Sequence, residues 1–353
     1  MANSGLALFL GRLYGERGFD SMRIGKGLYQ VLLFFLSQLA ETRLSVGGQA
    51  VIEGVMMRAP RSLTVAVRKP KGQVTVKRQD LRPASDRFPF LKFPLLRGVV
   101  ALVEALIYGI SALNYSANEA LVEEGAEGEE LSPWALTGIM VFSLGLGVAL
   151  FFILPLYLTQ LTAAWVPLVR RSSLFFNLID GFLRIAVFLI YVALISLLKD
   201  VRRVFEYHGA EHVAIHAYEE GRDLEVAKAK GLSPLHPRCG TAFLLWVMVI
   251  SIFVFSLLPK DLSLGAKILS RIVLLPLIAG ISYELIKLSG RGKYPLVGWL
   301  TKPGLWLQKI TTRDPRDDQV EVAIRALSEV LEMEREKRGP GPGPGGAIEA
   351  ISR

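Results

Sequence analysis

The chain has 353 residues, of which 51% are hydrophobic, and its formal net charge is +9. This apolar content points to segments that cross a membrane. The single cysteine excludes an internal disulfide, so nothing points to an oxidising compartment. In a membrane protein, the positive charge is typical of the positive-inside bias and of contact with anionic lipid, and nucleic acid explains it less well.

Two regions precede the apolar segments. In residues 1–44, the apolar run 28–40 is too short to span about 30 Å of hydrocarbon, so we expect a helix that lies on the membrane or packs against the helix bundle. Residues 45–92 predict a basic, β-containing cytoplasmic domain. Within it, Leu63 to Arg68 and Val74 to Arg78 are short β-branched runs, and the segment between them predicts a hairpin turn.

This second region carries a concentrated positive charge. Between Arg58 and Arg87 there are nine Lys or Arg residues and two Asp residues. Each basic residue near an anionic membrane surface contributes about 1 kcal/mol of attraction. We therefore expect contact with lipid headgroups, and a ribosome or translocon surface is the alternative partner. A second copy of the chain is a further partner that the sequence leaves open.

Residues 93–130 predict an amphipathic helix followed by an acidic linker. Glu104 interrupts the apolar part of that helix, which makes it too short for a confident span. The membrane domain, residues 131–290, predicts four spans near 134–158, 172–198, 241–258 and 267–284. Pro155 predicts a kink or an end in the first span, and Pro276 interrupts the fourth.

Four spans place both termini and the loop 199–240 on one side of the membrane. The Lys- and Arg-rich segments 199–203 and 287–302 make that side cytoplasmic. Residues 291–338 follow as a C-terminal helix region with an amphipathic helix from Asp317 to Arg338, and the Gly-Pro-rich tail 339–353 predicts disorder. The expected fold is a mostly α, multi-pass inner-membrane protein with a small cytoplasmic β-containing N-terminal domain.

One ion pair is predicted inside the second span, where Asp180 and Arg184 stand four residues apart. By default, an ion pair inside the membrane indicates a functional site. We favour a structural pair near the far headgroups, because the charge-free part of this span is only residues 185–198. A transporter is a third interpretation, but no internal repeat supports it.

All four histidines fall between residues 208 and 236. In a helix, His208, His212 and His216 share one face. The order His-x-x-Glu-His is the pattern of inverted zinc proteases, so it predicts His208 and His212 as metal ligands and Glu211 as the general base. Coincidence is the competing explanation, because the pattern is short and Gly209 in a helix costs about 1 kcal/mol.

The neighbourhood strengthens the metal hypothesis. His236 and Cys239 lie in one short segment, so every imidazole and thiol of the chain falls within residues 208–239. Glu284, at the cytoplasmic end of the fourth predicted span, is expected at the depth of the histidines and is the predicted third ligand. Further candidate ligands or site residues are Glu206, His216, His236, Cys239 and Glu53. The predicted cofactor is a divalent metal, with zinc preferred.

Three motifs carry a resemblance to a known family: the run Gly47 to Arg58 (GGQAVIEGVMMR), the segment Tyr207 to His212 (YHGAEH) and the segment His236 to Thr241 (HPRCGT). Together they resemble a bacterial membrane family of unknown function labelled YqhQ-like and described as metal-dependent enzymes. The resemblance covers roughly residues 45–330 and implies a metal-dependent activity. The glycines of the first motif permit tight turns or close backbone approach, and Glu53 could turn toward a site. The alternative is a Gly-rich edge of the β-domain.

The function predicted from these observations is metal-assisted hydrolysis at the cytoplasmic membrane surface. A closed His/Cys ligand set would instead make the metal structural. The alternative function belongs to another class, a non-catalytic accessory factor that docks a ribosome, translocon or membrane protein through its basic face.

Overall fold

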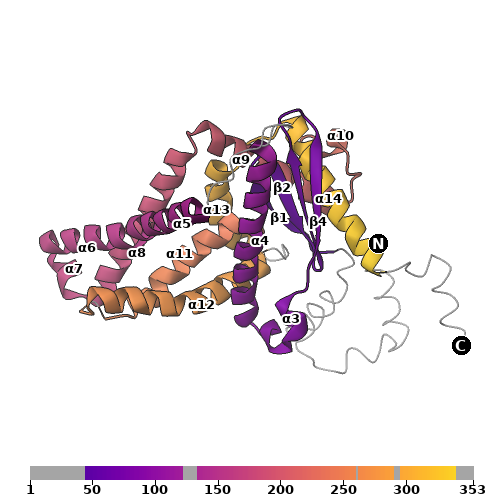
Figure 1. The fold of residues 1–353 in the computed structure, drawn as a ribbon. Coiled ribbons are helices and arrows are strands. Elements are labelled where there is room, and N and C mark those ends of the chain that lie inside the picture. The colour runs from indigo at the N-terminus through magenta and orange to yellow at the C-terminus, as the bar shows by residue number, and fades with distance from the viewer. Residues whose placement is uncertain (1–43, 122–132, 260, 290–294, 339–353) are drawn as a thin grey trace, which may run out of the picture. The chain divides into compact units, whose positions relative to one another are not determined.

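The computed structural model describes residues 44–121, 133–259, 261–289 and 295–338 (Figure 1). The chain divides into two compact units, 1–44 and 45–353, and everything below concerns the second unit. The predicted helix at 28–40, the acidic linker and the C-terminal tail lie outside the described residues. The strands are β1 (Gly47–Val51), β2 (Gly54–Arg58), β3 (Ser62–Arg68) and β4 (Val74–Asp80). The longer helices are α4 (Leu96–Leu121), α5 (Pro133–Val148), α6 (Leu154–Trp165), α8 (Ser173–Ile195), α9 (Lys199–Glu220), α11 (Gly240–Ser256), α12 (Leu264–Ser289), α13 (Pro295–Thr311) and α14 (Asp317–Arg338).

The four strands form one antiparallel sheet in sequence order. The predicted hairpin is confirmed, with Arg68 of β3 opposite Val74 of β4. The Gly-rich motif supplies the other hairpin, β1 and β2. Glu53 stands in its turn with φ 53°, a left-handed conformation that is uncommon outside glycine.

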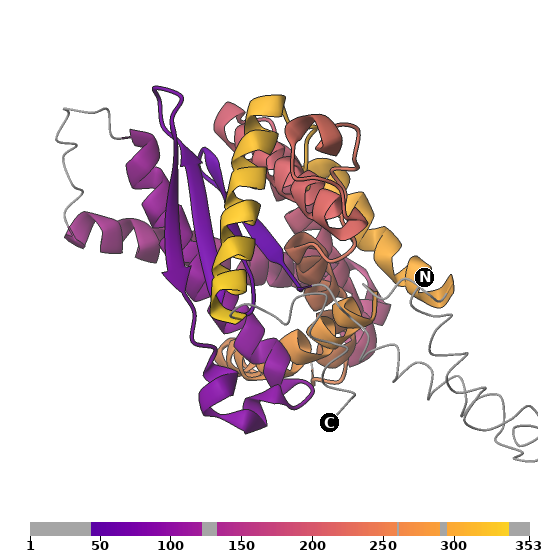
Figure 2. The same ribbon diagram turned by 90° about the vertical axis from the view of Figure 1, so that its right-hand side faces the viewer.

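Both faces of the sheet are covered, which explains why most of β3 is buried. Leu63, Val65 and Val67 of β3 pack into a core shared with Tyr108 and Ala112 of α4. On the other face, the hydroxyl of Thr64 donates to the carbonyl of Ala326 in α14 (2.7 Å). Side chains alternate between faces along a strand, so the sheet lies between α4 and a second layer formed by α14 and α9 (Figure 2).

Acidic residues of α14 pair with two arginines of the basic sheet. Arg68 pairs with Glu321, and Arg78 pairs with Glu329 and Glu332. The predicted amphipathic helix from Asp317 to Arg338 is confirmed with the same bounds. Much of the charge predicted to meet an external partner therefore has an internal one.

Four helices are long and apolar enough to cross a membrane, within Leu96–Ala120, Val141–Trp165, Ser173–Ile195 and Gly265–Lys287. Three of them correspond to predicted spans. The predicted span at 241–258 is α11, which has 17 residues and falls below the usual length of about 20. It packs against α8, α12 and α13. The fourth candidate is α4, whose sequence was too punctuated for a confident prediction.

Two prolines that were expected to interrupt spans are accommodated inside helices. A single π-helical turn, Ala149–Ile153, stands between α5 and α6, just before Pro155. Such a turn accommodates the loss of the backbone hydrogen bond that proline cannot donate. Helix α12 continues through Pro276.

Candidate metal centre

Helix α9 links the apolar helices to the sheet and carries three of the four histidines. It follows α8 after a short turn and ends at Gly221, whose φ of 73° forms a left-handed C-cap. Most side chains from Tyr207 to Ala217 are buried, because β1, β2 and α14 enclose the helix. Gly209 is required there, since an added Cβ would lie 2.0 Å from the carbonyl oxygen of Arg313. Glycine at position 209 lowers the stability of the helix, but only a residue without a side chain allows this close packing.

The first histidine group consists of His208, His212 and Cys239. One ligand atom from each residue lies within 4.8 Å of the others. The His208 Nε2 atom is 3.1 Å from the Cys239 sulfur, and a ring nitrogen of His212 lies within 4.8 Å of both atoms. Cys239 is placed there as the N-cap of α11. Zinc bonds of about 2.0–2.3 Å to nitrogen and sulfur are compatible with this spacing.

The backbone determines which imidazole nitrogens face the sulfur as lone pairs. His208 donates from Nδ1 to the carbonyl of Thr311 (2.8 Å), and His212 donates from Nδ1 to the carbonyl of Pro234 (2.6 Å). A carbonyl can only accept, so each neutral ring carries its proton on Nδ1 and leaves Nε2 free to ligate. A hydrogen bond from the other ring nitrogen to a backbone carbonyl is typical of metal-bound histidines. Cys239 has one thiol proton, so it can donate a hydrogen bond to only one of the two Nε2 lone pairs.

The second histidine group consists of His216, Glu219 and His236, and its hydrogen bonds differ. His236 Nδ1 accepts from the backbone N–H of Arg238 (3.2 Å), so its proton resides on Nε2, which faces Glu219 (3.4 Å). Glu219 is also paired with Arg238. The nitrogen that would have to bind a metal is therefore protonated, and the group forms a closed hydrogen-bonded set.

Glu211 lies beside both groups without joining either. Its side chain packs on Gly48 of β1, where an added Cβ would lie 2.8 Å from two Glu211 atoms. The close backbone approach predicted for the Gly-rich motif therefore occurs at Gly48. Burial raises the pKa of the Glu211 carboxyl, and the electrostatic interactions with His208 and His236 and a hydrogen bond from Gly48 oppose this shift. A carboxyl whose pKa is raised toward neutrality is suited to proton transfer.

Burial acts in the opposite direction on the histidines. It lowers the pKa of His212, an effect that the hydrogen bond to Cys239 opposes. It also lowers the pKa of His216 and of His236. Desolvation disfavours the charged imidazolium, so all three rings are held in the neutral form that a metal requires.

Three other predicted site residues are engaged elsewhere. Glu284 forms an ion pair with Arg97 at the start of α4, and neither ligand group includes it. Glu206 accepts from the amide of Gln319 (3.0 Å). Glu53 accepts from Arg203 (2.6 Å), so it holds the β1–β2 turn against α9. We therefore leave all three out of the candidate ligand set.

Sequence reasoning missed several contributing residues. Glu219 of the second group could have been found from its i, i+3 spacing to His216 on one helix face. Thr241 could not, because its contacts with the Cys239 sulfur, 3.1 Å from the hydroxyl and 3.4 Å from the backbone nitrogen, depend on how the loop enters α11. The carbonyls of Thr311 and Pro234 carry no side-chain signal at all.

The predicted pair of Asp180 and Arg184 has a third member. One carboxylate oxygen of Asp180 accepts from Arg184 (2.9 Å) and from Arg271 of α12 (2.7 Å). All three side chains are buried, and both guanidinium groups lie over the ring of Phe255. The cluster ties α8 to α12, which favours the structural interpretation.

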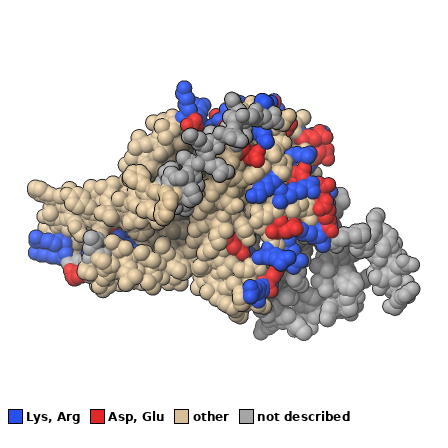
Figure 3. Space-filling model, in the orientation of Figure 1, with Lys and Arg blue, Asp and Glu red and all other residues tan. Residues whose placement is uncertain are grey.

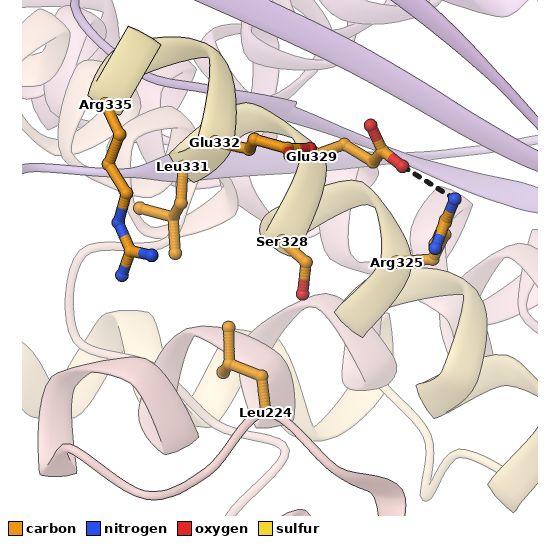
Figure 4. Close-up of a pocket in the computed structure, with 7 residues that line it drawn as sticks. All are labelled: Leu224, Arg325, Ser328, Glu329, Leu331, Glu332 and Arg335. Carbon is orange, nitrogen blue, oxygen red and sulfur yellow. Dashed lines mark ion pairs between the residues drawn. The ribbon is translucent and has the colours of Figure 1, made fainter. Parts of the chain in front are cut away.

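A surface pocket of about 300 Å³ lies between α14 and Leu224, away from the histidines (Figure 4). Its lining includes an ion pair between Arg325 and Glu329. Glu329 and Glu332 also bind Arg78 of the sheet. These charges are engaged with one another, so the pocket does not compete with the histidine cluster as a site.

Comparison with known proteins connects the chain to a family. The family model described as "Protein of unknown function (DUF1385)" matches residues 93–333. The "Uncharacterized protein YqhQ" of Bacillus subtilis (strain 168) is 33% identical over 299 residues, covering 82% of this chain and 92% of that protein. No solved structure matches. The chain therefore belongs to the DUF1385 family.

Proposed function

We propose that this protein is a metal-dependent membrane enzyme in which His208, His212 and Cys239 hold one divalent ion, preferably zinc. The observation that carries the proposal is the orientation of the two imidazoles. Backbone carbonyls hold both Nδ1 protons, so two Nε2 lone pairs and one sulfur converge. Three protein ligands leave a fourth tetrahedral position open, as in catalytic zinc sites.

The proposed reaction class is hydrolysis. A bound zinc ion would supply a water of pKa near 7 and polarise the substrate. Glu211 is the proposed general base, because its buried carboxyl interacts with His208 and His236 and has no ion pair to Lys or Arg among the described residues. Gly48 fixes its position by direct contact. The substrate class stays unassigned between peptide, ester and phosphate.

We further propose a multi-pass membrane location with the metal centre at the cytoplasmic surface. Figure 3 supports this location, since charged side chains gather at the sheet end and at the far tip of the apolar helices, with an almost uncharged surface between. At that tip, Arg170 and Arg171 of α7 (Pro167–Arg171) mark the opposite headgroup level. The histidine helix begins where α8 leaves the apolar zone.

Metal content tests the first part of the proposal. Detergent-purified protein should contain about one zinc ion per chain. Reconstitution with Co²⁺ should give a thiolate-to-metal charge-transfer band that Cys239→Ser abolishes. Protein that binds no divalent ion, or a Co²⁺ spectrum unchanged by Cys239→Ser, would remove this ligand set.

A pair of carboxylate variants tests the enzyme. Glu211→Gln keeps the size of the side chain but removes the base, so metal and fold should persist while activity in cells falls by about 100-fold or more. The matched control is Glu219→Gln, which alters a carboxylate of the second group. If Glu211→Gln complements a deletion strain as well as the parent while His212→Ala does not, the metal is structural.

If Glu211→Gln complements the deletion strain and His212→Ala does not, the result favours the accessory-factor alternative. It rested on the basic face of residues 58–87, and part of that face is paired with α14 in the structure. Competitor-resistant binding of the full-length protein to ribosomes would restore it.

A further inference from the structure

Helix α4 presents an unusual combination of properties. Its apolar content makes it a candidate span, yet one of its faces lies along the sheet. Glu104 pairs with Arg58 of β2, and Glu119 pairs with Lys69 after β3. These two ion pairs are 15 residues apart, which corresponds to about 22 Å of helix.

The ion pairs exclude a transmembrane orientation for this part of α4. If residues 104–119 crossed the hydrocarbon, the sheet with its arginines and lysines would have to enter it as well. Charged groups and open sheet edges are not tolerated there. The helix must therefore stay at the membrane surface or in water.

The contacts at the start of α4 favour the surface. An added Cβ on Gly98 would lie 3.0 Å from the Cα of Gly280, so α4 crosses α12 in close backbone contact. In Figure 1, α4 runs across the end of α12 instead of alongside it. Because α12 is a candidate span, a helix that crosses its end lies along the plane of the membrane.

The face of α4 opposite to all these contacts is apolar and exposed. Val103, Leu106, Ile107 and Ile110 share it, with exposed fractions of 47–59%. The segment that leads into α4 adds Phe88, Phe90 and Phe93, which are also exposed. Phe88 and Phe90 stand between the basic residues Arg87 and Lys92, and Phe93 follows Lys92. Apolar and aromatic groups flanked by basic residues are typical of interfacial helices.

We propose that this apolar face, together with the phenylalanine segment, is the surface through which the sheet domain rests on the lipid bilayer. The occupant is the boundary between headgroups and acyl chains. Two observations select lipid: α12, the candidate span that α4 crosses, also has exposed apolar side chains, including Leu269, Ile272 and Val273, and Arg68 and Arg78 of the sheet are paired with α14. The face ends at Asn114 and Asn118, where the helix leaves the interface. This inference rests on the membrane location proposed above and is independent of the metal.

Spin labels test the contact in full-length protein reconstituted into phospholipid vesicles. Labels at Ile107→Cys and Ile110→Cys are compared with a lipid control, Ile272→Cys on α12, and a water control, the exposed Asp223→Cys. Parent protein corrects for any labelling of the buried Cys239. Accessibility to oxygen, which partitions into lipid, is divided by accessibility to a water-soluble nickel complex.

The ratio at positions 107 and 110 should match that at 272 and exceed that at 223 severalfold. A ratio equal to that at 223 would place the face in water and overturn the proposal. Low accessibility to both reagents would mean that protein covers the face, which also overturns it, and removal of residues 1–43 would show whether that segment is the cover. A water-like ratio at 272 would instead refute the membrane location, and unchanged zinc content would leave the metal proposal standing.

Discussion

The two histidine groups on α9 contain similar residue types but differ in what their ring nitrogens contact. In the first, two rings donate from Nδ1 to backbone carbonyls and present unprotonated Nε2 atoms to Cys239. In the second, a backbone N–H occupies the Nδ1 lone pair of His236 and directs its proton toward Glu219. Proximity of ligand types is therefore not sufficient for a metal site, because the hydrogen bonds behind each ring decide which nitrogen can coordinate.

The largest effect expected from this difference is on metal content. His212→Ala removes one of three ligands, so zinc affinity should fall by more than about 100-fold, which exceeds the effect of losing a hydrogen-bond partner of a ligand. His216→Ala removes a ring of the second group and should leave about one zinc per chain. Elemental analysis of both purified variants measures this. Equal metal loss in the two variants would mean that the groups act as one site.

A smaller effect should follow from the contact that positions Glu211. Gly48→Ala places a Cβ 2.8 Å from Glu211 and from the carbonyl of Met56, and overpacking of this kind costs about 1–3 kcal/mol of stability. Gly47→Ala is the matched control, because nothing lies within 4 Å of its added Cβ. Thermal unfolding in detergent compares the two. Equal melting temperatures would show that Glu211 is not held by β1.

The pH dependence of the metal-free protein tests the burial of both groups. The folded-state pKa values of His212 and His236 lie below the ordinary 6.5, so the unfolded chain takes up protons first as the pH falls. Their contribution to stability is present above about pH 6.5 and is lost below it, at up to about 2.7 kcal/mol per pH unit for two groups.

Glu211 opposes this trend. Its folded-state pKa lies above the ordinary 4.5, so its protonated form stabilises the fold at low pH and this contribution is lost as the pH rises. The net effect of acidification below pH 6.5 should be a loss of stability, because the buried histidines outnumber the single carboxyl. Melting temperatures of metal-free protein between about pH 7 and about pH 5 measure it. A flat profile would contradict the burial of these histidines.

The smallest effect concerns the sulfur's surroundings. Thr241→Val removes the hydroxyl that lies 3.1 Å from the Cys239 sulfur. Zinc affinity should fall about tenfold, the lower end of the range for residues that hydrogen-bond a metal ligand. Competition with a coloured chelator measures the affinity. Ser233→Ala, in the same loop but bonded to Leu235, should leave it unchanged.

Local patterns predicted much of the fold. The apolar spacing of residues 317–338 gave the bounds of α14, and the β-branched runs around Lys69 gave the β3–β4 hairpin. Helix α9 placed His208 and His212 one turn apart, as the spacing required. The orientation of α4 was not predictable in this way, because its apolar face reads the same in a span and in an interfacial helix.

Long-range partners account for the rest of the site. Arg271 joins Asp180 from 91 residues away, and Glu284 is engaged by Arg97 from 187 residues away. Neither spacing has a local sequence signature. Depth and order along the chain therefore predict Glu284 as a metal ligand, whereas in the structure its carboxylate is paired with Arg97. The same limit applies to Gly48, whose contact with Glu211 depends on how the sheet docks on α9.

The sequence by itself determined the chemistry that is available: four imidazoles and one thiol within 32 residues, a helical phase that aligns three of the imidazoles, and apolar segments long enough to span a membrane. Helical phase is a local property, fixed by 3.6 residues per turn. Only the tertiary structure decided which imidazoles are able to coordinate, because the carbonyls of Thr311 and Pro234 reach the rings from segments that chain folding brings to α9. A backbone carbonyl is the same in every residue, so no pattern of side chains predicts its position.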